Sequence, residues 1–430
     1  FKRQERRNFG DGAFHGRDGE LDVQQPRAVN PLTKAFVASA VAAGHQETED
    51  FNGASQDGFG VWDVNQRHGT RLSSSRAFLH PVMSRPNLSV LTDCFVERVE
   101  LTKGRATGVV VVHEGTRKTL SASQEVILAG GAINSPHLLM LSGIGAAAEL
   151  EGHGIRVQHE LTGVGRNLQD HPSVPLAMLD DSATAYAMSW HSLPRMMASP
   201  LQYLFARRGM LASNAAEGGG FFRTRPGLDR PDVQVTLLAG LKGTARAIPR
   251  EHGIMLLVSL LRPTSRGWMS LASADPATRP VLHPAFLEAR EEVQTLIDGV
   301  RETRRILARD PIREMLGTER TPGAQVQSDE DLERAIRATL STVYHPVGTC
   351  KMGPASDAQA VVDQKLKVHG VERLRVADAS IMPNIIGGNT SAPTMMIGER
   401  VSAFILGTDS RASEGVVRSK ETAYAEPARI

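Results

Sequence analysis

Two segments near the carboxyl end of the chain each carry a side chain that can bind a proton or donate a hydrogen bond. In both segments, neighbouring proline and glycine residues restrict the conformation of the backbone. The first, residues 342–353, contains His345 followed by Pro346. Proline disfavours the α region for the preceding residue, so we expect the His345 imidazole on a short extended loop and not on a helix face. The second, residues 387–396, contains Asn389, 44 positions after His345 (389 − 345). Together they indicate a base held in a fixed orientation.

A helix is predicted directly after Asn389. Pro393 stands where a helix can begin, and apolar residues follow it at helical spacing: Ile397, Val401, Phe404 and Ile405. The start of this helix would carry partial positive charge, available to an electron-rich ligand. The simpler alternative is that residues 393–406 form only a core helix.

The pattern resembles the glucose–methanol–choline (GMC) family of flavin oxidoreductases, and most closely its choline-dehydrogenase and alcohol-dehydrogenase-like branch. The resemblance covers nearly the whole chain. Besides the two segments above, it rests on residues 131–145, which read GAINSPHLLMLSGIG, and on weaker matches at residues 163–171 and 376–383.

The resemblance implies an FAD enzyme in which an alcohol gives its hydroxyl proton to the loop histidine and hydride to flavin N5. His345 matches that base, and Asn389 matches the second member of the pair. A histidine with a pKa near 6.5 can accept a proton at neutral pH, and an amide can hold the alkoxide oxygen. The cofactor contacts implied by the family fall on these residues: Val96, Asp378, Ala379, Thr390, Pro393 and Thr394.

Two residues are candidates for the substrate pocket. Tyr344 adjoins the base, and Glu217 falls in a region that resembles the substrate domain of choline-type members. A carboxylate there could attract a quaternary ammonium group, although an exposed loop glutamate is the simpler interpretation. Because aromatic residues make up only 5% of the chain, a neutral primary alcohol is the favoured substrate class.

Two other functions stay open at this point. Some relatives cleave hydroxynitriles in a reaction in which the flavin is neither reduced nor oxidised, so lyase chemistry is the first alternative. A non-catalytic remnant unable to retain FAD is the second. Hydrolase chemistry has little support, because the sequence has no His-Glu-x-x-His zinc motif and no Gly-x-Ser-x-Gly elbow.

The second alternative arises from a missing motif. The family carries a Gly-x-Gly-x-x-Gly loop that holds the FAD pyrophosphate at a helix N-terminus, and no such loop occurs here. Gly163-Val164-Gly165 supplies only two of the glycines. The chain begins with Phe1, which matches a point past that unit in the family, so we expect a fragment or a truncated product.

The composition of the chain limits the kinds of binding partner that we expect. The formal charge of +2 gives no electrostatic case for nucleic acid or for an acidic surface. Cys94 and Cys350 show no metal-binding spacing, and no apolar run approaches the ~18 residues that span a bilayer. We expect a cytoplasmic protein with no bound metal, and leave open a peripheral position on a membrane and a homo-oligomer. The sequence leaves the electron acceptor open.

The expected fold class is α+β/α/β, with an FAD-binding Rossmann-like domain and a substrate-binding domain made of an antiparallel sheet flanked by helices. Residues 1–85 would form connecting loops and part of the substrate or cap region. The FAD-binding domain would use residues 86–170 and 356–408, and the substrate-binding domain residues 171–355. Residues 409–430 would be a disordered tail.

Several elements can be placed from local patterns. Strands are expected at residues 88–92, 95–101, 106–113, 125–128, 254–261 and 374–377, and one opening at Pro231. Helices are expected at residues 76–79 and 291–308 and after Ser328. A further helix should start with Ser135 as N-cap and Pro136 at its first position and end before Gly143.

Overall fold

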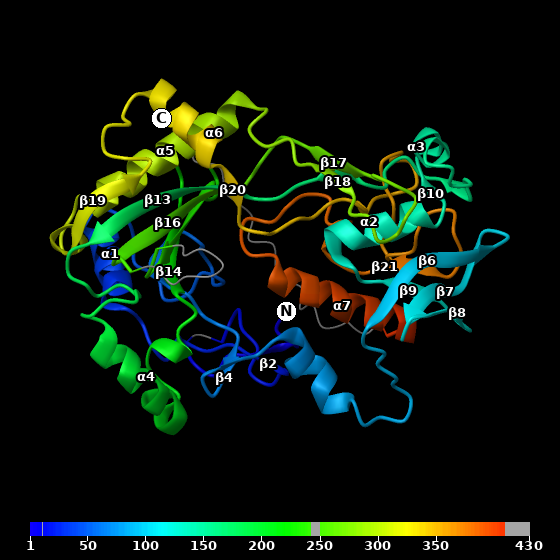
Figure 1. Ribbon diagram of the computed structural model, residues 1–430, viewed down its shortest axis with the longest axis horizontal. Helices are drawn as coiled ribbons and strands as arrows, with labels where there is room; N and C mark the ends of the chain where they lie inside the picture. The colour runs from blue at the N-terminus through cyan, green and yellow to red at the C-terminus, as the bar shows by residue number, and fades with distance from the viewer. Residues whose placement is uncertain (11, 242–249, 409–430) are drawn as a thin grey trace, which may run out of the picture.

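The protein folds into two lobes, each around its own apolar core (Figure 1). The computed structural model describes residues 1–10, 12–241 and 250–408, so the expected disordered tail lies outside the described residues. One lobe is built on a large antiparallel sheet, and the other on small sheets, helices and loops. The predicted mixture of α and β structure with an antiparallel sheet is confirmed.

The large sheet has the strand order β19-β13-β16-β15-β14-β3, and β20 pairs with the start of β13. All of these pairings are antiparallel. The strands are β3 (Gly58–Val61), β13 (Pro172–Asp180), β14 (Ala216–Phe222), β15 (Val233–Leu238), β16 (Gly253–Leu260), β19 (Leu316–Thr321) and β20 (Ser341–Thr342). The strands expected after Pro231 and at residues 254–261 are therefore present as β15 and β16.

Helices α1 (Pro31–Ala42), α5 (Arg290–Leu307) and α6 (Asp329–Thr339) share the core of this sheet. The predicted helices at residues 291–308 and after Ser328 are confirmed, and the Ser328 side chain accepts a hydrogen bond from the Asp331 amide at 3.1 Å. Gly299 lets α5 lie close to the sheet, because a Cβ there would come within 2.9 Å of Val258.

The second lobe contains an antiparallel sheet of β6 (Cys94–Thr102), β7 (Arg105–His113) and β8 (Thr116–Ser121). Beside it, β9 (Val126–Leu128) pairs in parallel with β21 (Leu374–Val376). The prediction of a strand at residues 88–92 is wrong, because this mostly exposed stretch follows a turn and pairs with no described strand.

Helix α2 (Gly131–Leu141) begins earlier than expected, so the prediction that Ser135 caps it is wrong and Pro136 lies inside it. Asp378, at the end of β21, accepts hydrogen bonds from the Gly131 amide at 3.0 Å and from the Ser135 hydroxyl. The helix can therefore start at Gly131, capped by a residue far away in the sequence. It ends before Gly143, as predicted.

Shorter elements complete the fold. Three further helices are α3 (Ala147–Gly152), α4 (Leu193–Ala206) and α7 (Ser391–Leu406). Short strands pair as β1 (Glu5–Arg6) with β2 (Leu21–Asp22), β4 (Gln66–Arg67) with β5 (Thr70–Arg71), and β10 (Ile144–Gly145) with β11 (His159–Glu160), and a small sheet contains β12 (Arg166–Leu168), β17 (Gly267–Ser270) and β18 (Val281–His283). Short helical turns lie at Ser75–Leu79, His80–Val82, Met210–Ala212, Ile312–Met315 and Ala379–Ile381. Among the described helices, none has the length and apolar character needed to cross a membrane.

Candidate active site

The loop that carries His345 is attached to the segment before β13. Gln169 and Val347 exchange backbone hydrogen bonds of 3.1 and 2.9 Å. The Asp170 carboxylate accepts hydrogen bonds from the backbone amides of His345 at 2.8 Å and His171 at 2.7 Å, and from the Thr342 hydroxyl. One buried carboxylate thus holds the His345 loop and the segment before β13 together.

His345 and Asn389 come together as the sequence predicted. The Asn389 amide nitrogen lies 3.3 Å from His345 Nε2. The orientation of this amide is set by Gln234 on β15, whose side-chain nitrogen donates to Asn389 Oδ1 at 3.4 Å. With its oxygen occupied by a donor, Asn389 presents its NH₂ group to His345.

A second histidine, His171, lies behind His345. Its Nδ1 is 3.0 Å from His345 Nδ1, and its Nε2 is 2.9 Å from the carbonyl oxygen of Ile386. A carbonyl only accepts, so His171 Nε2 carries a proton, and in a neutral ring its Nδ1 is then an acceptor. His345 must therefore donate from Nδ1, which leaves its Nε2 unprotonated and facing the Asn389 NH₂.

Burial keeps both rings neutral. It lowers the pKa of His171 to about 4, with a smaller contribution from the neighbouring His345. Burial also lowers the pKa of His345, although the Asp170 charge opposes the shift. At neutral pH the site therefore presents an imidazole with a free lone pair.

The start of α7 adjoins this pair. The helix begins at Ser391, two residues before the expected Pro393, with Thr390 as its N-cap. Thr394 bonds back to the Thr390 carbonyl through its amide at 3.1 Å and its hydroxyl at 2.7 Å. No described side chain caps the first turn, and no acidic residue lies in it. The amides of Ser391 and Ala392, both exposed, are therefore donors suited to an electron-rich ring such as the flavin pyrimidine.

The remaining predicted cofactor residues have different surroundings. The Asp378 carboxylate is buried and accepts hydrogen bonds from Gly131, Ser135 and Ser380, so this side chain stabilises the local backbone conformation. The Ala379 carbonyl accepts from the Gly348 amide at 3.3 Å, which joins this turn to the His345 loop. Val96 is a half-buried residue of β6, opposite Val111, in the sheet of the second lobe.

Tyr344 and Glu217 differ sharply. Tyr344 is 76% exposed and has a left-handed backbone, with φ 62°, directly before the base. The interpretation of Glu217 as an exposed loop residue is wrong, because it is fully buried in β14. Its two oxygens accept hydrogen bonds from four donors that lie on three separate segments: the Asn30 amide and the hydroxyls of Thr33, Tyr186 and Ser213. Glu217 therefore anchors the start of α1.

Sequence reasoning missed the supporting residues His171, Asp170 and Gln234. The first two belong to the 163–171 motif, which carried the resemblance but received no role of its own. Nothing in the local pattern around Gln234 distinguishes it from other strand residues, because its contact with Asn389 depends on the fold. Within the described residues no group of His, Cys, Asp and Glu side chains could hold a metal ion.

The sequence matches known protein families and relatives over most of its length. Two family models described as GMC oxidoreductase match residues 2–173 and 263–398. The chain is 42% identical over 408 residues to an alcohol dehydrogenase [acceptor] of Pseudomonas putida, covering 94% of this chain and 74% of that protein. It is 41% identical over 411 residues to mitochondrial choline dehydrogenase of Mus musculus, covering 95% of this chain and 68% of that protein.

Solved structures show the same fold. Pyridoxine 4-oxidase from Mesorbium loti superposes with a TM-score of 0.81 at 26% identity, over 94% of this chain and 75% of that one. Formate oxidase superposes with a TM-score of 0.83 at 24% identity, over 95% and 77%. This protein belongs to the GMC oxidoreductase family of FAD-dependent enzymes.

Proposed function

We propose that this protein oxidises the CH–OH group of a primary alcohol to an aldehyde, with His345 Nε2 as the base. The observation that carries the proposal is the unprotonated Nε2, which faces Asn389 beside the open start of α7. The start of α7 would hold the pyrimidine ring of FAD, and the bound flavin would supply the hydride acceptor for the alcohol carbon. The carbon loses a hydride and the oxygen a proton, so a C=O bond forms.

The residues of this chain handle the proton and the oxygen. The substrate hydroxyl donates to His345 Nε2 while the Asn389 NH₂ group donates to the same oxygen. His171 and Asp170 position the imidazole: the first accepts from Nδ1, and the second holds the backbone amide. The lowered pKa of His345 keeps the base neutral before the substrate arrives.

The names of the relatives support an alcohol as substrate, since one is an alcohol dehydrogenase and another a choline dehydrogenase. Choline carries a quaternary ammonium group, which a carboxylate could recognise. Glu217, the carboxylate considered for this role, is saturated by internal donors and has no exposed surface. A neutral primary alcohol is therefore the proposed substrate class.

Anaerobic reduction of the flavin tests the proposal. In flavin-loaded protein, His345→Ala should lower the rate of flavin bleaching by a primary alcohol by about 10³-fold, within the range expected for loss of a general base. His283→Ala, at an exposed histidine of β18, is the matched control and should keep the full rate. Bleaching at the unchanged rate in His345→Ala would exclude the base assignment. A wild-type flavin that no alcohol bleaches would exclude alcohol oxidation.

A further inference from the structure

Helix α4 packs against the protein through its polar side. Arg195 donates to the carbonyl oxygens of Thr184 and Ala185 at 3.0 and 3.1 Å. Ser199 is buried and accepts from the Leu211 amide at 3.3 Å, and the Tyr203 hydroxyl lies 3.3 Å from that of Thr70. Arg195, Ser199 and Tyr203 follow at i, i+4 and i+8 and so share one face.

The opposite face of α4 is apolar and open. It carries Leu193, Met197, Leu201, Leu204 and Phe205, whose exposed fractions run from 40% for Leu193 to 81% for Phe205. Their spacing of i, i+4, i+8, i+11 and i+12 forms one continuous stripe. Trp190, just before the helix, is 87% exposed. This polarity is the reverse of that of an ordinary surface helix, which buries its apolar face.

The charged residues around helix α4 are positively charged. Residues 182–216 contain no aspartate or glutamate, whereas Arg207 and Arg208 follow the last turn directly. Arg207 is the C-cap of α4 and is held over the Tyr203 ring at 4.8 Å. The exposed apolar stripe therefore ends in cationic side chains.

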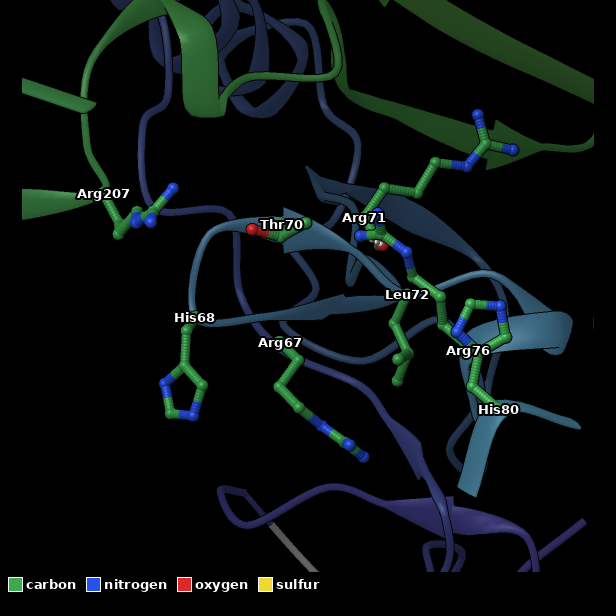
Figure 2. A pocket seen from close by; sticks show the side chains of 8 residues that line it. All are labelled: Arg67, His68, Thr70, Arg71, Leu72, Arg76, His80 and Arg207. Carbon is green, nitrogen blue, oxygen red and sulfur yellow. Dashed lines mark hydrogen bonds between the residues drawn. The ribbon is translucent and has the colours of Figure 1, made fainter. Parts of the chain in front are cut away.

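A basic hollow of about 380 Å³ adjoins this end of the helix (Figure 2). It is lined by side chains of the β4–β5 hairpin, the following helical turns and the α4 C-cap: Arg67, His68, Thr70, Arg71, Leu72, Arg76, His80 and Arg207. Asp22 neutralises Arg67 through bonds of 2.7 and 3.3 Å. Among the lining residues none is acidic, so three arginines keep an uncompensated charge.

We propose that the α4 stripe and the adjoining basic hollow form a docking face for the surface of an anionic lipid bilayer. The stripe would insert among the acyl chains near the headgroups, and Arg71, Arg76 and Arg207 would bind lipid phosphates. This site is separate from the alcohol site and does not depend on the proposed function.

Charge argues against a second copy as the occupant of this face. In a two-fold symmetric dimer the stripe would pack on itself, and Arg207 and Arg208 would meet either the same residues of the second copy, if the helices run parallel, or the start of its α4, if they run antiparallel. No acidic residue in 182–216 is available to pair with them. An anionic bilayer offers both an apolar interior and the missing negative charge.

Vesicle cosedimentation tests the proposal. The flavin-loaded protein should sediment with vesicles of phosphatidylcholine mixed with phosphatidylglycerol, and much less with pure phosphatidylcholine. Leu201→Gln/Phe205→Gln should weaken binding to the mixed vesicles at least tenfold, because the stripe loses two apolar anchors. Arg71→Gln/Arg76→Gln should weaken it roughly tenfold on mixed vesicles, with no effect on pure phosphatidylcholine.

Matched controls separate this site from general surface effects. Leu282→Gln removes a leucine of β18 that is 45% exposed, and Arg225→Gln removes an exposed arginine that does not line the hollow. Both should bind vesicles like the wild type, and all variants should unfold at the wild-type temperature. The proposal is overturned if the wild type does not sediment with mixed vesicles, or if the α4 variant sediments normally. It is also overturned if that variant changes the oligomeric state and leaves vesicle binding intact.

Discussion

His171 and His15 are two buried histidines that this protein treats in opposite ways. His171 lies in the candidate active site, with a histidine and a carbonyl as partners, and burial lowers its pKa to about 4. His15 lies in the N-terminal segment between two carboxylates, with Nδ1 3.0 Å from Glu5 and Nε2 2.9 Å from Asp50. Burial alone would lower its pKa, but the bonds to Asp50 and Glu5 outweigh it and raise the pKa.

Burial acts to lower the pKa of both histidines, and the partners of each ring decide whether this shift stands, as in His171, or is reversed, as in His15. Where both ring nitrogens meet carboxylates, the ring is a cation that ties the N-terminal segment to the loop before β3. Where one nitrogen meets a carbonyl and the other a second imidazole, the ring is neutral and fixes a proton position. The two sites should therefore respond to pH with opposite signs.

The largest effect is expected for His171. Its folded pKa lies below the unfolded value of 6.5, so the unfolded state binds more protons between pH 6.5 and about 4, and stability falls as the pH is lowered through this window. The gap corresponds to about 3 kcal/mol. Between pH 6.5 and pH 4, the free energy of unfolding of His171→Asn should fall by about 3 kcal/mol less than that of the wild type, as measured by denaturant unfolding. An unchanged pH dependence would show that His171 is not held neutral.

His15 should show the opposite sign. Its folded pKa is raised, so its contribution is full below pH 6.5 and is lost as the pH rises through the folded pKa. His15→Gln should cost about 2 kcal/mol of unfolding free energy at pH 5.5, where charge-assisted hydrogen bonds are lost, and less at pH 8.5. Urea unfolding at the two pH values measures this gap. Equal losses at both would remove the contrast with His171.

A smaller effect tests the link between the sheet and the active site. Gln234→Leu removes the donor that orients Asn389 and puts an apolar side chain of similar size in its place on β15. We expect kcat/KM for alcohol oxidation to fall about fivefold, since one neutral hydrogen bond is worth about 1 kcal/mol. Unfolding free energy, measured in parallel, should change by a similar small amount. A full rate would show that Asn389 needs no support from the sheet.

Local patterns predicted what local physics determines. The periodic apolar residues of α5, the cap at Ser328 and the strand β16 were all placed correctly from sequence, because each depends on neighbours in the chain. The pairing of His345 with Asn389 came from the family motifs. It could not come from spacing, because 44 residues separate the two and the fold alone brings them to 3.3 Å.

Two errors, at α2 and at Glu217, arise from contacts between segments that lie far apart in the sequence. Helix α2 starts at Gly131 because Asp378, from a distant strand end, caps it. Glu217 is buried because donors from three separate segments surround its carboxylate. The apolar face of α4 cannot be assigned to solvent or core from periodicity, since an amphipathic pattern does not say which side packs. At α2 and at Glu217 a tertiary contact thus overrides a local preference, whereas residues 88–92 form no strand because they find no partner among the described strands.

The tautomer of His345 tests the central claim most directly. In flavin-loaded protein with ¹⁵N-labelled histidine, the His345 signals can be assigned by their loss in His345→Gln. At pH 7 we expect a neutral ring with a protonated Nδ1 and an unprotonated Nε2, and in His171→Leu, which offers no acceptor to Nδ1, a loss of this preference. An imidazolium, or a neutral ring protonated at Nε2, would contradict the assignment of His345 Nε2 as the base.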